Sequence, residues 1–220
     1  MFVISIEKFE QLDRDKQNNI RHVALKIFAE KGYEDASTNQ MVKEAGISKG
    51  TLFYYFDNKE GLFQYLVDYG LKIIQREYIE QMDYTTDDFI QRMENNSKIK
   101  YQYFQKYPAV NLFLSTALYK EFDRLSKKHQ KKFKELIEYT KNEMSHQTTI
   151  REDLFKEDID PKKASRIIDL SINGYFNELS QRYKQQHFEK KDIEHLWDDF
   201  EHFLDALREV FYKEFEEESQ

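Results

Sequence analysis

The chain has 220 residues, a net charge of −7 and no cysteine, so a disulfide framework and thiolate chemistry are excluded. Its two prolines, six glycines and abundance of helix-forming residues predict an all-α fold of about nine helices. No apolar run is long enough to cross a membrane, and the N-terminus lacks the pattern of a secretory signal. We therefore expect a soluble, cytoplasmic protein with no membrane partner.

The N-terminal stretch contains one predicted helix and one ambiguous segment. Residues 1–13 mix apolar and acidic side chains, which fits either the start of a helix or a loose, partly disordered arm. Residues 14–31 repeat apolar side chains at helical spacing, and Gly32 is placed to end that helix.

Residues 37–62 read as two short helices joined by a glycine turn, followed by the start of a third. Ser37 is a favourable N-cap, and Gln40 three residues later predicts a capping box. Gly46 can adopt the positive φ at which a helix ends, and Ser48 caps the next helix. Two helices joined by so short a turn predict a helix-turn-helix unit.

The second helix of this unit has two different faces. Leu52, Phe53 and Phe56 are spaced to face a core. The residues left to face outward are Lys49, Gly50, Thr51, Tyr54 and Tyr55. Such side chains suit a DNA groove, because they offer donors to phosphates and base edges and glycine permits close approach. The alternative is that they form only the polar side of an amphipathic helix.

Several spaced elements of this region together resemble the N-terminal domain of the tetracycline-repressor (TetR) family, over about residues 17–65. The matching runs are Phe28-Ala29-Glu30-Lys31-Gly32-Tyr33, Ala45-Gly46-Ile47-Ser48-Lys49-Gly50-Thr51-Leu52-Phe53-Tyr54-Tyr55-Phe56, Lys59-Glu60 and Leu62-Phe63. Family members often have Thr where this chain has Ala36, and Ile-Ala where it has Met41-Val42. Neither departure touches the outward face of the second helix.

The resemblance implies a DNA-binding domain at residues 1–58 and a ligand-binding and dimerisation domain at residues 59–220. It implies that double-stranded DNA is contacted by Ser37, Thr38, Ser48, Lys49, Gly50, Thr51, Tyr54, Tyr55 and Lys59.

The rest of the chain is predicted to be a series of amphipathic helices. Asp57 or Asn58 caps a helix that reaches about residue 81, with no flexible linker before it. Further helices are expected at about residues 86–105, from Pro108, at residues 121–150, from Pro161 and at residues 191–216.

Aromatic residues make up 15% of the chain, and several tyrosines fall in its middle helices. They could simply fill a core, or they could line an apolar pocket with hydroxyl groups for a small ligand. We favour a pocket, because the resemblance implies one between the middle helices. The candidates for its lining are Tyr103, Phe104, Phe113 and Tyr175.

The last two predicted helices carry broad apolar stripes, which predict a four-helix interface in a homodimer. Ser171 and Gly174 are small and three residues apart, so two backbones could approach closely there. The expected interface residues are Ile168, Ser171, Tyr175, Trp197, Phe200, Leu204 and Phe211.

Other chemistry receives little support from the sequence. The set His195, Asp198, Asp199 and His202 has spacing that could hold a metal, but it falls on the face expected to be solvated. The basic run at residues 127–132 is read as the solvated face of a helix, with nucleic-acid binding as the minority alternative. Neither a Gly-rich phosphate loop nor a nucleophile-elbow pattern is found, so we expect no cofactor, no metal and no enzymatic activity.

These observations favour a transcriptional repressor that binds a palindromic operator as a homodimer and is released by a small apolar effector. Most of the negative charge lies after residue 60, which favours a neutral or cationic effector over an anionic one. The alternatives are a DNA-binding regulator that senses nothing and, less favoured, a helical enzyme or metal-binding bundle.

Overall fold

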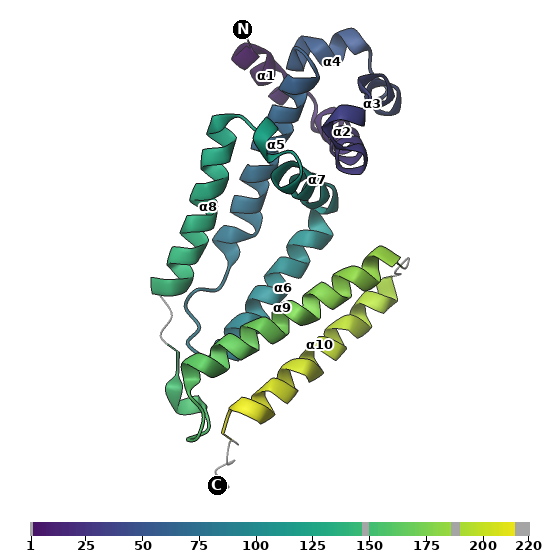
Figure 1. The fold of residues 1–220 in the computed structure, drawn as a ribbon. Coiled ribbons are helices and arrows are strands. Elements are labelled where there is room, and N and C mark those ends of the chain that lie inside the picture. Colours follow the sequence, from purple (N-terminus) through teal and green to yellow (C-terminus); the bar gives the residue numbers. More distant parts are fainter. Residues whose placement is uncertain (1, 147–149, 186–189, 214–220) are drawn as a thin grey trace. The chain divides into compact units, whose positions relative to one another are not determined.

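The computed structural model describes residues 2–146, 150–185 and 190–213, and it confirms the all-α prediction (Figure 1). These residues form ten α-helices and three short 3-10 helices, with one antiparallel β-bridge between Phe155 and Tyr212. The chain divides into two compact units, residues 1–82 with 99–142, and residues 83–98 with 143–220. None of the helices within the described ranges has both the length and the apolar composition that a membrane crossing requires.

The two units share two of the helices. Unit 1 contains α1 (Phe2–Glu10), α2 (Arg14–Asp35), α3 (Thr38–Ala45), α4 (Lys49–Phe56), α5 (Lys59–Glu77), α7 (Pro108–Tyr119) and most of α8 (Lys127–His146), with 3-10 helices at Ile79–Gln81 and Phe122–Arg124. Unit 2 contains α9 (Pro161–Gln185), α10 (Lys190–Phe211) and a 3-10 helix at Glu152–Leu154. Helix α6 (Phe89–Lys106) starts in unit 2 and ends in unit 1.

The N-terminal segment is a helix and not a loose arm. Phe9 of α1 is fully buried, with its ring centroid 4.8 Å from that of Phe56 and 5.4 Å from that of Tyr65. Burying a Phe side chain contributes about 1.5–3 kcal/mol, which offsets part of the cost of ordering a short terminal helix. Phe9 therefore anchors α1 to the rest of unit 1.

Several predicted helices differ from the observed ones at their ends. The helix expected to end at Gly32 continues, across a kink at Gly32 (φ 72°), to Asp35. The helix expected to begin at residue 121 begins at Lys127, after a 3-10 turn. The side chain of Gln64 donates to the carbonyl of Arg124 and accepts from the backbone N–H of Ser126, so a distant residue fixes this turn. The helix expected to reach residue 81 ends at Glu77 and is followed by a 3-10 turn.

Helix α5 is the centre of the unit 1 core. Its buried residues are Leu62, Phe63, Tyr65, Leu66, Val67, Gly70, Leu71 and Ile73. The ring of Phe63 lies 5.2 Å from that of Phe28 in α2 and 5.4 Å from that of Phe113 in α7. Packing thus groups α5 with the helices before it. The predicted boundary between the DNA-binding and ligand-binding domains, between residues 58 and 59, stays a prediction.

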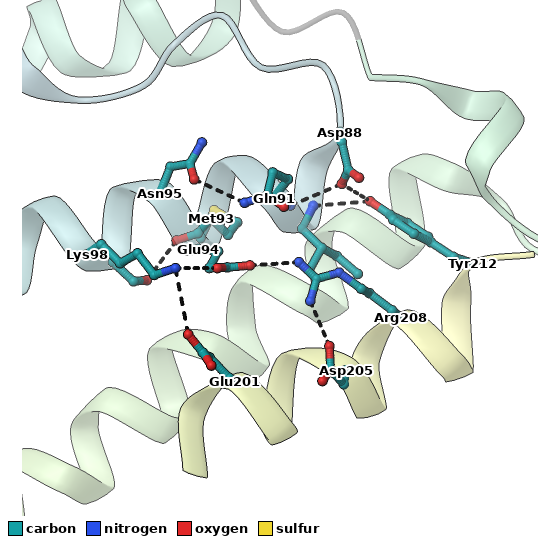
Figure 2. A network of polar contacts seen from close by, with 12 residues as sticks. Asp88, Gln91, Met93, Glu94, Asn95, Lys98, Glu201, Asp205, Arg208 and Tyr212 are labelled. Atoms are coloured by element: carbon teal, nitrogen blue, oxygen red, sulfur yellow. Dashed lines mark hydrogen bonds and ion pairs between the residues drawn. The ribbon is translucent and has the colours of Figure 1, made fainter. Parts of the chain in front are cut away.

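In unit 2, a polar network joins the first half of α6 to α10 (Figure 2). The largely buried carboxylate of Glu94 accepts from Lys98 at 2.6 Å and from Arg208 at 2.8 Å. Further along, the hydroxyl of Tyr212 donates to Asp88 at 2.9 Å and accepts from the backbone N–H of Ile90 at 3.1 Å. These bonds fix α6 against the end of α10.

At Gly70, α5 packs closely against Leu114 of α7. A Cβ at this position would lie 2.9 Å from Cδ2 of Leu114, closer than carbon atoms pack. We expect Gly70→Ala to lower the free energy of unfolding by about 1–3 kcal/mol, because it overpacks a filled core. Urea denaturation measures the change.

Gly50 provides the matched control, because a Cβ there would lie 3.7 Å from the Ser48 hydroxyl oxygen, which is ordinary contact. Gly50→Ala should leave stability unchanged or raise it by up to about 1 kcal/mol, as expected for an exposed helical glycine. If both variants unfold at the same urea concentration, the α5–α7 contact is not tight.

The Glu94 network predicts a pH-dependent stability. Burial raises the pKa of Glu94, but its bonds to Lys98 and Arg208 outweigh burial and hold that pKa below the ordinary value. The ionised form therefore stabilises the fold above the unfolded-state pKa, and this contribution is lost as pH falls through the folded-state pKa. Glu94→Gln should cost about 1–3 kcal/mol at pH 7 and clearly less at pH 3 in urea unfolding. Glu201→Gln, an exposed partner 3.8 Å from Lys98, should change little. An equal loss for Glu94→Gln at both pH values would contradict this account.

Candidate nucleic-acid interface

Helix α3 begins with the predicted cap but without the complete capping box. The side-chain oxygen of Ser37 accepts from the backbone N–H of Gln40 at 3.3 Å, which confirms the N-cap. The side chain of Gln40 donates to Glu44 at 2.7 Å and accepts from Lys31 at 3.0 Å. The side chain of Gln40 therefore bonds to Glu44 and Lys31. It does not accept from the backbone N–H of Ser37, so the second hydrogen bond of the capping box is not formed.

The turn between α3 and α4 follows the prediction. Gly46 has φ 66°, and the backbone N–H of Ile47 donates to the carbonyl of Val42 at 3.0 Å. Ser48 then caps α4 by accepting from the backbone N–H of Thr51 at 3.0 Å, and its hydroxyl lies 2.8 Å from that of Thr51. These local bonds fix the angle at which α4 leaves α3.

The inner face of α4 is packed. Leu52 and Phe56 are buried, together with Met41 and Ala45 of α3. Phe53, which was also expected to face the core, is only partly buried. This burial leaves the opposite side of α4 as the free surface of the unit.

The outer face carries most of the predicted DNA-contacting residues. Those exposed are Ser37, Ser48, Lys49, Gly50 and Tyr54, and those of intermediate exposure are Thr38, Thr51, Tyr55 and Lys59. Tyr55 is turned further inward than its spacing predicts, with its ring centroid 5.6 Å from that of Phe9. Lys49 and Gly50 form the exposed first turn of α4.

Lys59 is held in place beside the loop between α2 and α3. Its Nζ donates to the carbonyl of Glu34 at 2.9 Å and lies 4.7 Å from the ring centroid of Tyr33. Burial and the hydrogen bond to Glu60 raise the pKa of Tyr33 to about 12, so its hydroxyl stays protonated at neutral pH. Lys59 thus presents its charge from a fixed position at the N-terminus of α5.

Sequence patterns missed two residues of this region. Lys8 of α1 donates from Nζ to the hydroxyl of Tyr54 at 2.9 Å, and this bond raises the pKa of Lys8. Asn19 of α2 donates from its side chain to the carbonyl of Ala45 at 2.9 Å and so secures the end of α3. Each pair is far apart in the chain, so no local spacing could reveal it.

The structure places the four predicted pocket residues in different surroundings. Phe113 is fully buried in the unit 1 core, and Tyr103 is buried with its ring stacked on Tyr78 at 5.5 Å. Phe104 is 39% exposed on α6. Tyr175 belongs to unit 2. Their role in ligand binding stays a prediction.

The predicted dimer residues also divide into two groups. Ile168, Phe200 and Leu204 are buried in the core of their own unit, where they fill the space between α9 and α10. Those of intermediate exposure are Ser171, Tyr175, Trp197 and Phe211. A partner copy would therefore contact other apolar side chains first. Among the described side chains of α9 and α10, the large apolar ones that are exposed are Ile167, Leu170 and Val210.

The remaining candidates are solvated or lie outside the described side chains, with the exception of His129. Asp198, Asp199 and His202 are exposed, and the side chain of His195 is not among those described. Within the described parts of the chain, no group of three or more His, Asp or Glu side chains could hold a metal ion. In the basic run at residues 127–132, His129 is buried and lies 2.8 Å from the Gln64 side-chain oxygen.

The same region matches a known protein family. Residues 20–66 match the family model of bacterial regulatory proteins, tetR family. The match starts within α2 and ends within α5, so it includes α3, the glycine turn and α4.

Curated relatives match only part of the chain. The chain is 41% identical over 56 residues to the uncharacterized HTH-type transcriptional regulator YuxN of Bacillus subtilis, covering 26% of this chain and 19% of that protein. It is 38% identical over 74 residues to the regulator YxaF of the same organism, covering 33% of this chain and 39% of that protein. The chain thus spans well under half the length of these relatives.

Solved structures share the fold over most of the chain. A TetR family transcriptional regulator from Chloroflexus aurantiacus has a TM-score of 0.57 at 20% identity, covering 94% of this chain and 98% of that one. The TetR family transcriptional regulator PfmR from Thermus thermophilus has a TM-score of 0.50 at 20% identity, covering 75% and 85%. Residues 20–66, which include the helix-turn-helix of α3 and α4, thus resemble bacterial regulatory proteins of the tetR family, and the chain shares its all-α fold with solved regulators of that family.

Proposed function

We propose that this chain is a transcriptional repressor that binds a palindromic operator in double-stranded DNA as a homodimer and is released by a small effector. The observation that carries the DNA part is the exposed first turn of α4, formed by Lys49 and Gly50, on a helix-turn-helix whose inner face is packed. A helix presented in this way fits the major groove, where its N-terminal residues read base edges.

The outer surface offers two kinds of DNA contact. Lys49 and Thr51 carry donors that can distinguish bases, and Gly50 adds no side chain that would hold the backbone away from the groove. Lys59 and the N-terminus of α5 offer positive charge to a phosphate, which fixes position without reading sequence. The bond of Lys59 to Glu34 supports this role, because an anchored charge loses less freedom on binding.

The dimer is proposed from the exposed apolar faces of α9 and α10. Ile167, Leu170 and Gly174 share one face of α9, and the space around Gly174 is open. Val210 lies on α10 one turn after Leu207. A second copy on this surface would form a two-fold dimer, which presents two reading helices to half-sites about 34–36 Å apart or a multiple of that.

The effector is proposed to act through α5. This helix runs from Lys59, beside the helix-turn-helix, to Glu77, a length of roughly 28 Å at 1.5 Å per residue. A ligand that favours a different direction of α5 would change the spacing of the two reading helices. Coupling of about 1–3 kcal/mol is typical and would weaken operator binding roughly 5–150-fold.

Operator binding tests the DNA assignment. Fluorescence anisotropy with the chain's own upstream DNA should show Lys49→Ala weakening specific binding by about 10-fold or more, as expected for loss of a base contact worth 1–3 kcal/mol. Lys59→Ala should weaken binding to all sequences alike and reduce the salt slope by roughly one unit.

Lys72→Ala is the matched control, because Lys72 is an exposed lysine of α5 that lies more than three turns beyond Lys59. It should leave operator affinity unchanged. The groove assignment fails if Lys49→Ala and Lys59→Ala behave like this control at physiological salt.

The exposed face of α9 gives a test of the dimer. Ile167→Lys combined with Leu170→Lys should convert the dimer to a monomer in sedimentation at micromolar concentration, because two charges would enter an apolar interface. Asp198→Lys, an exposed change of equal charge on α10, should leave the dimer intact. A wild-type monomer, or a double variant that still forms dimers, would reject this interface.

A further inference from the structure

Unit 2 contains a cavity of ≈ 350 Å³ that the helix-turn-helix does not use. It is bounded by the segment before α6, the first turns of α6 and the start of α9. Tyr84, Phe89 and Met93 give it an apolar wall. Its polar lining consists of Asp83, Arg92, Asn96, Ser165, Arg166 and Asp169. A volume of this size and mixed lining fit a small molecule that has an apolar body and one polar group.

Arg92 is the unusual member of the lining. Its side chain is almost completely buried, with the residue only 5% exposed. Nη1 donates to the carbonyl of Thr86 at 2.8 Å, and the guanidinium carbon lies 5.4 Å from the ring centroid of Phe89. Nη2 is buried and has no hydrogen-bond partner among the described residues. A buried guanidinium with an unused N–H donor destabilises the fold unless another group accepts a hydrogen bond from it.

Nearby carboxylates do not supply the missing partner. Asp83 accepts from the backbone and hydroxyl of Thr86, and Asp88 accepts from the hydroxyl of Tyr212. The negative charges of these acids raise the pKa of Arg92, but burial lowers it by more. The guanidinium nevertheless remains charged at neutral pH. The positive charge of Arg92 is thus balanced by carboxylates at a distance and not by a direct ion pair.

The other cation of the lining already has a partner. Arg166, largely exposed on α9, donates to Asp169 at 3.3 Å, and both residues line the cavity. Arg92 is therefore the cation in the lining that lacks a direct ionic contact within the described residues. The network around Glu94 holds α6 in place (Figure 2), so the backbone that carries Arg92 is fixed before any ligand arrives.

We propose that this cavity binds a small carboxylate-bearing molecule, with the carboxylate on the guanidinium of Arg92 and the apolar body against Phe89 and Met93. An arginine fork matches a carboxylate in two parallel hydrogen bonds, which is a strong and directional contact. The proposal deepens the proposed function and rests on it only in naming this molecule as the effector. It reverses the expectation of a neutral or cationic ligand, because the unused donor of Arg92 would contact the ligand directly, whereas the overall acidity of the chain acts on it only at a distance.

Matched probes test the site on the full-length protein without DNA. Titration calorimetry with 4-phenylbutyrate, 4-phenylbutanol and 4-phenylbutylamine varies the head group on one apolar body. The carboxylate should bind at least ten times more tightly than the alcohol, and the amine should bind most weakly. Equal binding of carboxylate and alcohol, or no binding of the carboxylate at about 1 mM, would overturn the proposal.

Variants then locate the site. Arg92→Gln should remove the preference for the carboxylate while leaving alcohol binding unchanged, and Arg92→Lys should keep part of it. Arg166→Gln, at an exposed and already paired arginine, is the control and should keep the full preference. If Arg92→Gln does not fold, Ser165→Leu, which fills the cavity with Arg92 intact, should abolish carboxylate binding. Unchanged binding in the Ser165 variant would place the ligand elsewhere.

Operator binding separates this proposal from the proposed function. Carboxylate binding that depends on Arg92 but leaves operator affinity unchanged would keep the site and reject effector release. Operator binding without any preference for the carboxylate would keep the DNA-binding function and reject the site.

Discussion

Burial of α5 on several sides is the constraint on which unit 1 depends. Phe63 meets the rings of Phe28 and Phe113, and Gly70 lets Leu114 approach the helix backbone. The helix-turn-helix rests on the first turns of this helix, since Phe56 lies 5.0 Å from the ring of Tyr65. A change in the direction of α5 would therefore move the proposed DNA-reading surface with it, because close-packed interiors transmit small displacements.

Local and long-range interactions together define the proposed DNA-reading surface, which consists of the outer face of α4 and Lys59. Hydrogen bonds at Ser37, Gly46 and Ser48 fix the bends between helices within a few residues. Contacts between distant residues then set the position of the outer side chains, as in the bond of Lys8 to Tyr54 and that of Lys59 to Glu34. The surface is thus held in shape before DNA arrives, which lowers the entropy lost on binding.

The sequence predicted the local features and not the distant ones. The caps of α3, α4 and α5 and the positive φ of Gly46 could be predicted, because each depends on residues three or four positions apart. The turn fixed by Gln64 and the burial of Phe9 could not, since their partners are remote in the chain. An apolar stripe on a helix likewise does not reveal whether the same chain or a partner copy covers it. Phe200, which was predicted at the dimer interface, is buried in the core of its own unit. The same limit hid Arg92, whose burial and unused donor depend on the packing of a loop against α6 and α9.

In the proposed dimer, two copies of α4 read two half-sites on one duplex. Selection of bound sequences from a random pool of double-stranded DNA by the full-length chain tests this most directly. The account predicts enrichment of an inverted repeat whose half-site centres are about 10.5 base pairs apart or a multiple of that. Enrichment of a single half-site without a repeat, or no enrichment over the starting pool, would contradict it.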